Sequence, residues 1–550
     1  MRVDLIWISS GTAPAPAWGM GDVHPAAPTP GAVATAADNR DPAAEAVLFW
    51  DAALGMPDEA VVRAALRDPF DVWHAGLALG MGGLPWMIDF VDPVWRFNRD
   101  PDPDIAASSW RLSLGACLAR AAVLDRLGGP DPHFETLAGA ALELGHRWIR
   151  AGALLRHMAG LISPGARTLR PADVSLNDEI RFLRQRYGRV WTVWACWRRW
   201  RQSGNLLEIA QAFRRPHAPG AKSPAAALHE SPAGNFYPAR TNATVSVLVP
   251  TLDRYPHLFN LLDQLRQQTA RPLEIIVVDQ TARDSRDPRW PERFTDLPLR
   301  VLWLDIAGQC SSRNAGLAEA QGDYVLFLDD DDEIKPDLIA THLAFLDRFA
   351  ADASCGVAHE AGAGPLPAEF GLIRESDVFP TNNSLLRTNS LRGSGLFDLA
   401  YERGERADHD LGMRLYLSGA KLLLNPAAAV IHLHAPRGGL RQHKARVVTR
   451  SSSRRSVWQR QFLAPTEAYL WSRYFGADRA REAALIRTAS TLRGHGSRMQ
   501  RLARAVAMFV LLPDTWRQNK ARLAAGRVML AEFPAIPDYT PAVVEELLTL

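Results

Sequence analysis

The chain has 550 residues, which is enough for two or three domains, and its 47% hydrophobic and 22% charged residues are ordinary for a globular protein. Its formal net charge of +3 says little about partners. The four cysteines lie far apart without a CxxC pair, which argues against a disulfide framework or a zinc site and favours a reducing cytoplasm.

The N-terminal part is predicted to hold short strands and helices. Residues 1–18 contain a short apolar run without the basic and longer apolar regions of a signal peptide, so we expect a first strand there. Ala- and Pro-rich breaks interrupt the pattern up to residue 165. No stretch approaches the roughly 18–20 apolar residues that span a bilayer, so any membrane contact is expected to be peripheral.

A basic segment over 166–243 follows. It carries four tryptophans at three-residue spacing: Trp191, Trp194, Trp197 and Trp200. We interpret this stripe as a helix face packed on a neighbouring domain, and the alternative is an interfacial membrane helix. Residues 217–244 are rich in Pro, Gly and Ser and are predicted to be a linker.

Alternating strands and helices are predicted from Val245 onward. The expected strands are 245–252, 273–280, 299–304 and 324–328, and the expected helices are 257–269 and 313–321. This alternation is typical of an α/β domain with a mostly parallel sheet and right-handed crossovers.

The strand over 324–328 runs directly into four carboxylates, Asp329 to Asp332. Ligands of open α/β sheets bind at the carboxyl ends of the strands, and like charges at this density call for a cation. Oxygen ligands of this kind suit Mg²⁺ or Mn²⁺. Taken alone, the tetrad is equally compatible with a solvated acidic turn before a helix that begins near Pro336.

Several ordered motifs resemble one known family. VSVLVPTLDR, IIVVDQTARD, SSRNAGLAEAQGDYVLFLDDDD, NNSLLRTNSLRGSGLFD and RADHDLGMRL together are similar to the bacterial inverting GT-A glycosyltransferases of the family 2 type, over roughly residues 244–437. The resemblance implies a GT-A fold, which is a Rossmann-like α/β fold of nucleotide-diphospho-sugar transferases, in a catalytic domain over 244–449. It also implies a nucleotide-sugar donor, with a uridine diphosphate sugar expected.

The resemblance further implies a donor site and a metal site. Donor-binding positions match Pro250, Thr251, Arg254, Asp279, Arg313, Asp329 and Asp330. The metal, Mn²⁺ or Mg²⁺, is assigned to Asp329, Asp331 and His434, with the frame within Asp329–Asp332 open by one residue. Such a cation neutralises the leaving nucleoside diphosphate.

Inversion needs a base that deprotonates the acceptor hydroxyl, and the resemblance assigns that role to Asp408. Ala407 stands where relatives carry a Glu, which puts the acceptor contacts of that Glu in doubt. Asp410 and Arg414 are expected to lock the helix as an i,i+4 pair. His432 and His434 follow a strand. Each is either a metal ligand or a hydrogen-bonded core residue.

A basic loop, PRGGLRQHKARVVTR, comes after the two histidines. Its Gly438–Gly439 pair with Arg437, Arg441 and Lys444 would suit a hinged loop over a pyrophosphate. Nucleic acid is not expected as a partner, because no recognised nucleic-acid fold accompanies these basic residues.

Residues 120–153 align without gaps to residues 387–420 at a constant offset of 267. Asp51 likewise matches Asp329, but Ala52, Ala53 and Leu54 replace the next three acids and Ala141 replaces Asp408. We interpret residues 1–165 as a shortened, degenerate GT-A-like copy that cannot bind a metal or supply a base. Chance similarity of Ala/Leu/Arg-rich helices is the alternative.

Residues 450–550 are predicted to be helical and to cover an apolar face of the catalytic domain, with peripheral binding to an anionic membrane surface as the alternative. The expected function is metal-dependent, inverting transfer of a sugar to a hydroxyl of a glycan or lipid-linked acceptor, in the cytoplasm or at the inner membrane face. An inactive nucleotide-sugar-binding scaffold is the second hypothesis. A nucleotidyltransferase is the third, although the Gly-rich phosphate loop typical of that class is missing.

Overall fold

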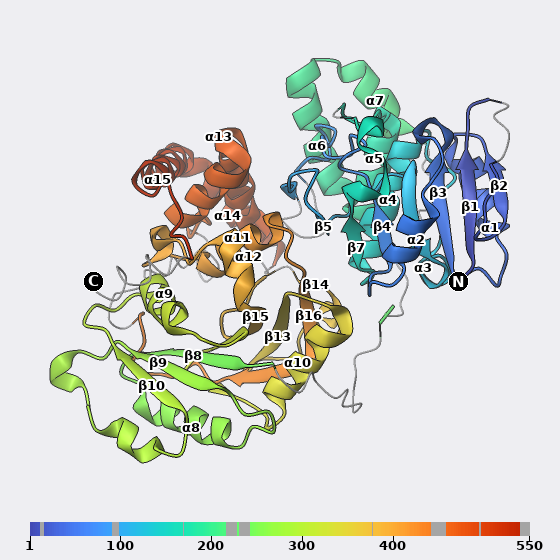
Figure 1. Cartoon of the computed structure of the whole chain (residues 1–550). Helices are drawn as coiled ribbons and strands as arrows, with labels where there is room; N and C mark the ends of the chain where they lie inside the picture. Colours follow the sequence, from blue (N-terminus) through green and yellow to red (C-terminus); the bar gives the residue numbers. More distant parts are fainter. Residues whose placement is uncertain are drawn as a thin grey trace.

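The structure is a computed structural model that describes residues 1–550 apart from 12–15, 91–97, 169, 216–227, 230–242, 377, 442–457, 494–496 and 540–550. Two α/β halves lie side by side, the first drawn in blue to teal and the second in green to orange (Figure 1). Each half is built on its own β-sheet.

The first half contains a seven-stranded sheet with the order β2-β1-β3-β6-β4-β7-β5. Its strands are β1 (Val3–Ile8), β2 (Val23–Ala26), β3 (Ala46–Asp51), β4 (Val72–His74), β5 (Ala107–Ser108), β6 (Ala116–Arg120) and β7 (Leu155–His157). The first strand expected at the N-terminus is confirmed by β1, whose residues are all buried. The helices of this half are α1 (Pro30–Asp38), α2 (Glu59–Ala65), α3 (Ala121–Leu127) and α4 (Leu137–Arg150).

The second half contains a nine-stranded sheet with the order β10-β9-β8-β11-β15-β13-β16-β12, and β14 also pairs with β16. Its strands are β8 (Val245–Thr251), β9 (Glu274–Asp279), β10 (Leu299–Trp303), β11 (Tyr324–Leu328), β12 (Asp332–Glu333), β13 (Ala353–Glu360), β14 (Arg374–Glu375), β15 (Asn383–Arg387) and β16 (Leu422–His432). The four predicted strands are confirmed and run parallel to one another. Beyond β11 the sheet is mixed, because β15 runs antiparallel to both of its neighbours.

The helices of the second half are α8 (Tyr255–Arg266), α9 (Gln309–Glu319), α10 (Leu338–Phe349), α11 (Leu391–Ser394) and α12 (Ala407–Leu417). The predicted helices 257–269 and 313–321 correspond to α8 and α9, each of which begins two to four residues earlier than predicted. The buried face of α8 consists of leucines at helical spacing, Leu258, Leu261, Leu262 and Leu265. This apolar periodicity is what predicts the helix from sequence.

Further helices follow each sheet. These are α5 (Leu176–Arg186), α6 (Gly188–Ser203) and α7 (Leu206–Arg214) after the first, and α13 (Pro465–Ala489), α14 (Arg498–Val510) and α15 (Leu512–Glu532) after the second. The tryptophan stripe lies on α6, where Trp191 contacts Phe90 and Trp194 donates a hydrogen bond to Glu482, whereas Trp197 and Trp200 are exposed. Within the described residues, no helix is both long and apolar enough to cross a membrane.

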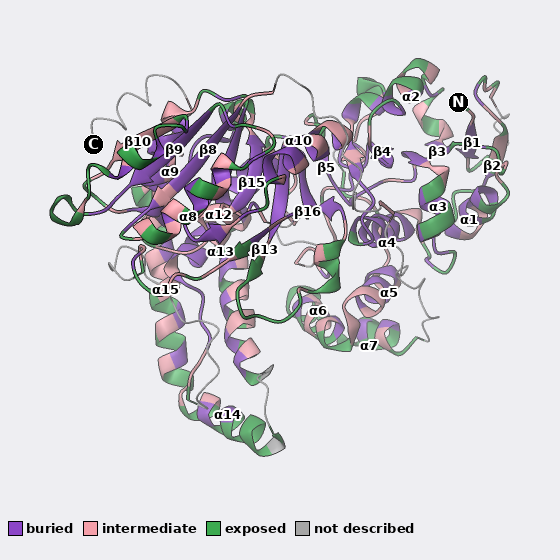
Figure 2. Cartoon of the chain, turned by 90° about the horizontal axis from the view of Figure 1, so that it is seen from below, coloured by how far each residue is buried: buried purple, intermediate pink, exposed green. Residues whose placement is uncertain are grey.

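The expectation that the C-terminal helices cover an apolar face is correct for α13 and wrong for α14. Tyr469 and Leu470 of α13 are buried, and α13 packs along α15. On α14, by contrast, Leu502, Val506 and Phe509 are 57–79% exposed, and the helix lies away from both sheets (Figure 2). The amphipathic pattern indicated an apolar face but not whether a neighbour would cover it.

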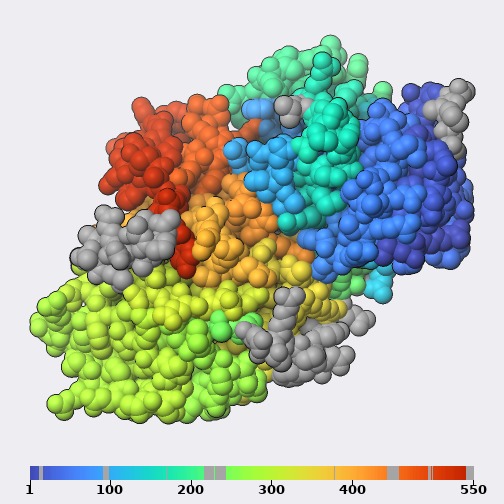
Figure 3. Space-filling model, in the orientation of Figure 1, coloured from blue at the N-terminus to red at the C-terminus, as the bar shows by residue number. Residues whose placement is uncertain are grey.

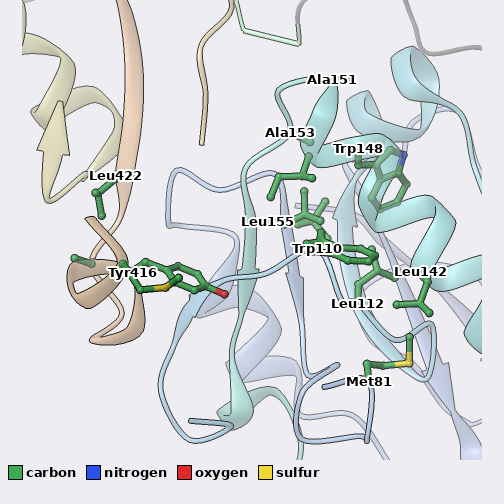
Figure 4. Packing of buried hydrophobic residues seen from close by; sticks show 14 of the residues in the cluster. Met81, Trp110, Leu112, Leu142, Trp148, Ala151, Ala153, Leu155, Tyr416 and Leu422 are labelled. Atoms are coloured by element: carbon green, nitrogen blue, oxygen red, sulfur yellow. The ribbon is translucent and has the colours of Figure 1, made fainter. Parts of the chain in front are cut away.

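The two halves touch over a broad surface (Figure 3). One buried hydrophobic cluster includes Trp110, Trp148 and Leu155 of the first half together with Tyr416 and Leu422 of the second (Figure 4). The core is therefore continuous across the boundary between the halves.

Candidate active site

The carboxyl ends of three parallel strands form the edge where the site lies. β8 pairs with β9 so that Thr251 is opposite Asp279, and β11 flanks β8 on its other side. The hydroxyl of Thr251 donates a hydrogen bond to Asp330 over 2.7 Å, which brings two of the predicted donor-binding residues into contact. Pro250 precedes Thr251 in β8 and is half-buried.

Asp279 lies at the inner end of this edge and is fully buried. Its carboxylate accepts hydrogen bonds from the backbone N–H of Thr281 at 2.9 Å, the hydroxyl of Tyr255 at 2.9 Å and the indole N–H of Trp290 at 3.2 Å. These donors offset the cost of burying the carboxylate. Sequence reasoning missed Tyr255 and Trp290, since no motif marks them and only the fold brings them to Asp279.

Two arginines face the acidic turn after β11. Arg313 reaches Asp329 over 3.0 Å, and Nη1 of Arg254 lies 3.1 Å from Asp330 and 3.2 Å from Asp331. Burial raises the pKa of Asp330 to about 7, although the charge of Arg254 opposes that shift. The acids of this turn are close together and partly or fully buried, so additional positive charge stabilises their ionised form.

The structure places His432, rather than the predicted His434, beside the two acids of the metal group. His432 lies with Asp329 and Asp331, and the candidate ligand atoms of these three residues are all within 4.8 Å of one another. The antiparallel pairing of β12 with β16 sets Asp332 opposite His432 and brings their side chains to 3.0 Å. His434 lies beyond the strand end and pairs with Glu360 instead, forming with His432 and Glu360 a second, more exposed group.

The group of Asp329, Asp331 and His432 fits a divalent cation. Among the described residues, the buried Oδ1 atom of Asp331 accepts no hydrogen bond, and it lies 3.7 Å from Nδ1 of His432. A buried carboxylate oxygen without a donor is costly, and a bound cation would satisfy it. Carboxylate oxygens are ligands that Mg²⁺ and Mn²⁺ prefer.

The glycine pair of the basic loop packs on the same edge. The N–H of Gly439 donates to the carbonyl of Leu252 over 2.7 Å. Both glycines have positive φ, and a Cβ on Gly438 would lie 2.6 Å from the carbonyl of Asp253. The loop thus approaches Arg254 in a way that only glycine permits. Its predicted Lys444 lies outside the described residues.

Asp408 lies in the first turn of α12, with 37% of its side chain exposed. Its Oδ1 accepts a hydrogen bond from Nδ1 of His409 at 3.0 Å. Partial burial raises the pKa of Asp408, but the neighbouring His409 and Arg406 outweigh that effect and hold it well below its usual range. The carboxylate is therefore ionised and accessible, which a proton acceptor requires, while the same two neighbours lower its basicity.

Helix α9 connects the segment before α12 to the acidic turn. Glu402 accepts hydrogen bonds from the backbone N–H groups of Cys310 and Ser311 at the start of α9. The same helix carries Arg313, which reaches Asp329. The expected pair on α12 is confirmed, since Nε of Arg414 lies 2.9 Å from Asp410.

Helix α13 supplies contacts that the sequence did not indicate. Glu467 binds Arg406 over 2.8 Å and Arg487 over 2.7 Å, and is itself buried. Arg406 has a positive φ of 85° directly before α12, so this ion pair fixes the backbone that presents Asp408.

A cleft of about 1020 Å³ opens beside this segment, between the two halves. Arg406 and His409 line one part of it, and Trp191 and Trp471 line another. The cleft also carries paired charges such as Arg479 with Glu482. Aromatic and charged side chains at one cleft are typical of sites for polar organic ligands.

Comparison with known proteins defines the class. Residues 246–395 match the family model "Glycosyl transferase family 2", and this part of the chain is a family 2 glycosyltransferase domain. The chain is 36% identical over 95 residues to the uncharacterised glycosyltransferase YwdF of Bacillus subtilis, covering 17% of this chain and 34% of that protein. It is 32% identical over 114 residues to the glycosyltransferase GlyA of Streptococcus pneumoniae, covering 20% and 16%.

The matched part of the chain thus spans only 34% and 16% of the lengths of these two relatives. Among solved structures, Staphylococcus aureus TarS 1-349 in complex with UDP-GlcNAc is 19% identical, with a TM-score of 0.34, over 55% of this chain and 91% of that one. The assignment to the family therefore rests on the sequence match, not on this structural likeness.

Proposed function

We propose that the second half catalyses metal-dependent, inverting transfer of a sugar from a nucleotide sugar to an acceptor hydroxyl. The observation that carries the proposal is the group of Asp329, Asp331 and His432 at the strand edge of the family 2 domain, with Arg254 and Arg313 beside it. Acids and arginines gathered at this edge suit a cation and a pyrophosphate together.

In this mechanism Asp329, Asp331 and His432 would hold Mn²⁺ or Mg²⁺, which would supply Lewis-acid stabilisation of the leaving diphosphate. Arg254 and Arg313 contribute charge to the diphosphate oxygens. Asp279, with Thr251 and Pro250, contacts the nucleoside at the inner end of the edge. A uridine diphosphate sugar is the donor we would test first.

Asp408 accepts the proton of the acceptor hydroxyl as that oxygen attacks the anomeric carbon. The hydrogen bond from His409 orients the Asp408 carboxylate and keeps it ionised. The ion pair of Arg406 with Glu467 holds the start of α12 in place. Ala407 stands where the resemblance implies a Glu that contacts the acceptor, so other residues must bind the acceptor in this chain.

We propose that the cleft between the halves binds the acceptor, a glycan or a lipid-linked saccharide. It begins at Arg406 and His409, next to the base, and its tryptophans offer flat surfaces for sugar rings. Trp471→Ala is expected to raise the acceptor KM without changing the donor KM. An unchanged acceptor KM would place the acceptor elsewhere.

We also propose that α14 contacts an anionic membrane surface. Its exposed Leu502, Val506 and Phe509 lie on a helix that carries the exposed Arg501, and Lys520 is exposed on the adjoining α15. Vesicles with 30% anionic lipid are expected to co-sediment the protein, and Phe509→Glu is expected to abolish that binding. Equal binding of both proteins would refute the proposal.

The function is tested by release of nucleoside diphosphate from a panel of nucleotide sugars with Mn²⁺ or Mg²⁺ and candidate acceptors. Metal-dependent turnover that is lost in Asp331→Ala and Asp408→Asn is the expected result. Donor binding without turnover for every donor and acceptor would instead favour a scaffold that binds nucleotide sugars. Ala407 is the feature that keeps this second function open.

A further inference from the structure

We infer that the two halves are copies of one unit paired about a pseudo-twofold axis, so that the first half occupies a dimer surface of the second. The inference concerns assembly and is independent of the proposed transferase activity. It rests on matching sheets, matching helices and reciprocal contacts across the boundary.

The two sheets share strand order and register. The order β2-β1-β3-β6-β4-β7-β5 corresponds to β9-β8-β11-β15-β13-β16-β14, with β10 and β12 added in the second half. Ala107 lies opposite His157 in the first sheet, and Arg374 lies opposite Leu424 in the second. Arg374 and Leu424 come 267 residues after Ala107 and His157, respectively. The two sheets therefore agree in strand pairing and in register at this position.

Interior contacts repeat at the same offset. Glu143 and Arg147 form a buried i,i+4 pair on α4, as Asp410 and Arg414 do on α12. Arg147 also binds the carbonyl of Leu127, and Arg414 binds the carbonyl of Ser394. Chance similarity between helices does not predict the same long-range partners, so the two units share one packing plan.

The helices after each sheet also correspond, at an offset of 288. α5 ends before Gly188, which has φ +77°, and α13 is kinked at Gly476, which has φ +83°. The residues two positions before these glycines reach the paired acids, Arg186 to Glu143 and Tyr474 to Asp410. The repeated unit therefore includes α5 and α6 in the first half and α13 in the second.

Contacts across the boundary are reciprocal. Gly152 faces the carbonyl of Ile373, where a Cβ would lie at 2.8 Å, and Gly419 faces the carbonyl of Ala106, where a Cβ would lie at 2.7 Å. Gly419 and Ile373 are the counterparts of Gly152 and Ala106 at the offset of 267. Such an exchange of equivalent partners defines a twofold interface.

Equivalent residues also meet each other, as residues on a twofold axis must. Ser108 donates a buried hydrogen bond over 2.7 Å to Glu375, its own counterpart. Trp194 donates over 3.0 Å to Glu482, its counterpart in the second half. These two points lie in different layers, one between edge strands and one between helices, and together they define the axis.

The Ser108–Glu375 contact explains why the pairing is asymmetric. Two copies of the second half in this arrangement would bury Glu375 against Glu375, and facing buried carboxylates are unfavourable. Serine in the first half replaces that repulsion with a hydrogen bond. The partner that fits the surface is thus the first half, rather than another copy of the second.

The test keeps the full chain and cuts it once. A site-specific protease sequence is inserted within residues 217–227, and the cut protein is analysed by gel filtration at micromolar and nanomolar concentration. The fragments are expected to elute together as a 1:1 complex. Separation of the wild-type fragments at micromolar concentration would overturn the inference.

Two variants at the interface between the halves, at Ser108 and Trp194, make the test more specific. Ser108→Glu recreates the facing carboxylates and is expected to weaken fragment association at least 100-fold, whereas Ser10→Glu, at an exposed serine of the same half, should leave it unchanged. Circular dichroism of the uncut variant checks folding, and if Ser108→Glu does not fold, Trp194→Ala takes its place. If the fragments of Ser108→Glu or Trp194→Ala dissociate no more readily than those of Ser10→Glu, the twofold interface between the halves is refuted.

Discussion

Replacing Asp408 by Asn tests the proposed base most directly. Asn keeps the shape of the side chain and an oxygen that accepts from His409, but it cannot take a proton. Removal of a general base costs about 10²–10⁴-fold in rate. At about 1.36 kcal/mol per tenfold, that loss corresponds to roughly 2.7–5.4 kcal/mol of transition-state stabilisation.

The assay is initial-rate release of nucleoside diphosphate in the presence of acceptor, with donor binding measured separately by calorimetry. We expect kcat to fall by this factor while the donor Kd stays unchanged, because Asp408 is not assigned a donor contact. Asp478→Asn, at a side chain that is 81% exposed, is the matched control. A variant that keeps more than about a tenth of the wild-type kcat would refute the assignment of Asp408.

Three further predictions concern the metal group, the buried core and acid stability. His432→Ala should weaken Mn²⁺ binding by more than about tenfold in calorimetry, while His434→Ala should not, and the reverse order would restore the assignment made from sequence. Arg414→Leu should lower the free energy of unfolding by about 3–5 kcal/mol in urea, because it removes the cation that pairs with the buried Asp410 carboxylate, which keeps the neutral hydroxyl of Tyr474. The exposed Arg481→Leu should be neutral. Burial lowers the pKa of His342 to about 4, so the folded state holds it neutral and the stability it contributes is lost as pH falls from about 6.5 towards 4. His342→Gln should flatten that loss in urea titrations, and an unchanged pH slope would contradict the reasoning.

The first four strands of the second half, β8 to β11, were predictable along the chain because each carries a local signal. Apolar runs such as residues 245–249 and 324–328 are buried on both faces, and acids or turn residues mark their ends. The helix pair of Asp410 and Arg414 was equally local, since an i,i+4 spacing already brings the two side chains together. Site residues on these elements could therefore be named from motifs.

The sequence by itself determined the family 2 motifs, the acidic edge and the 267-residue offset between the halves. Only the tertiary structure brought His432 rather than His434 to Asp331, because that choice depends on pairing between β12 and β16, which are about 100 residues apart in the chain. Only the tertiary structure set Ser108 against Glu375 as well. Local patterns record periodicity and order along the chain, whereas the register between distant strands and the contacts between the halves arise only when the whole core packs.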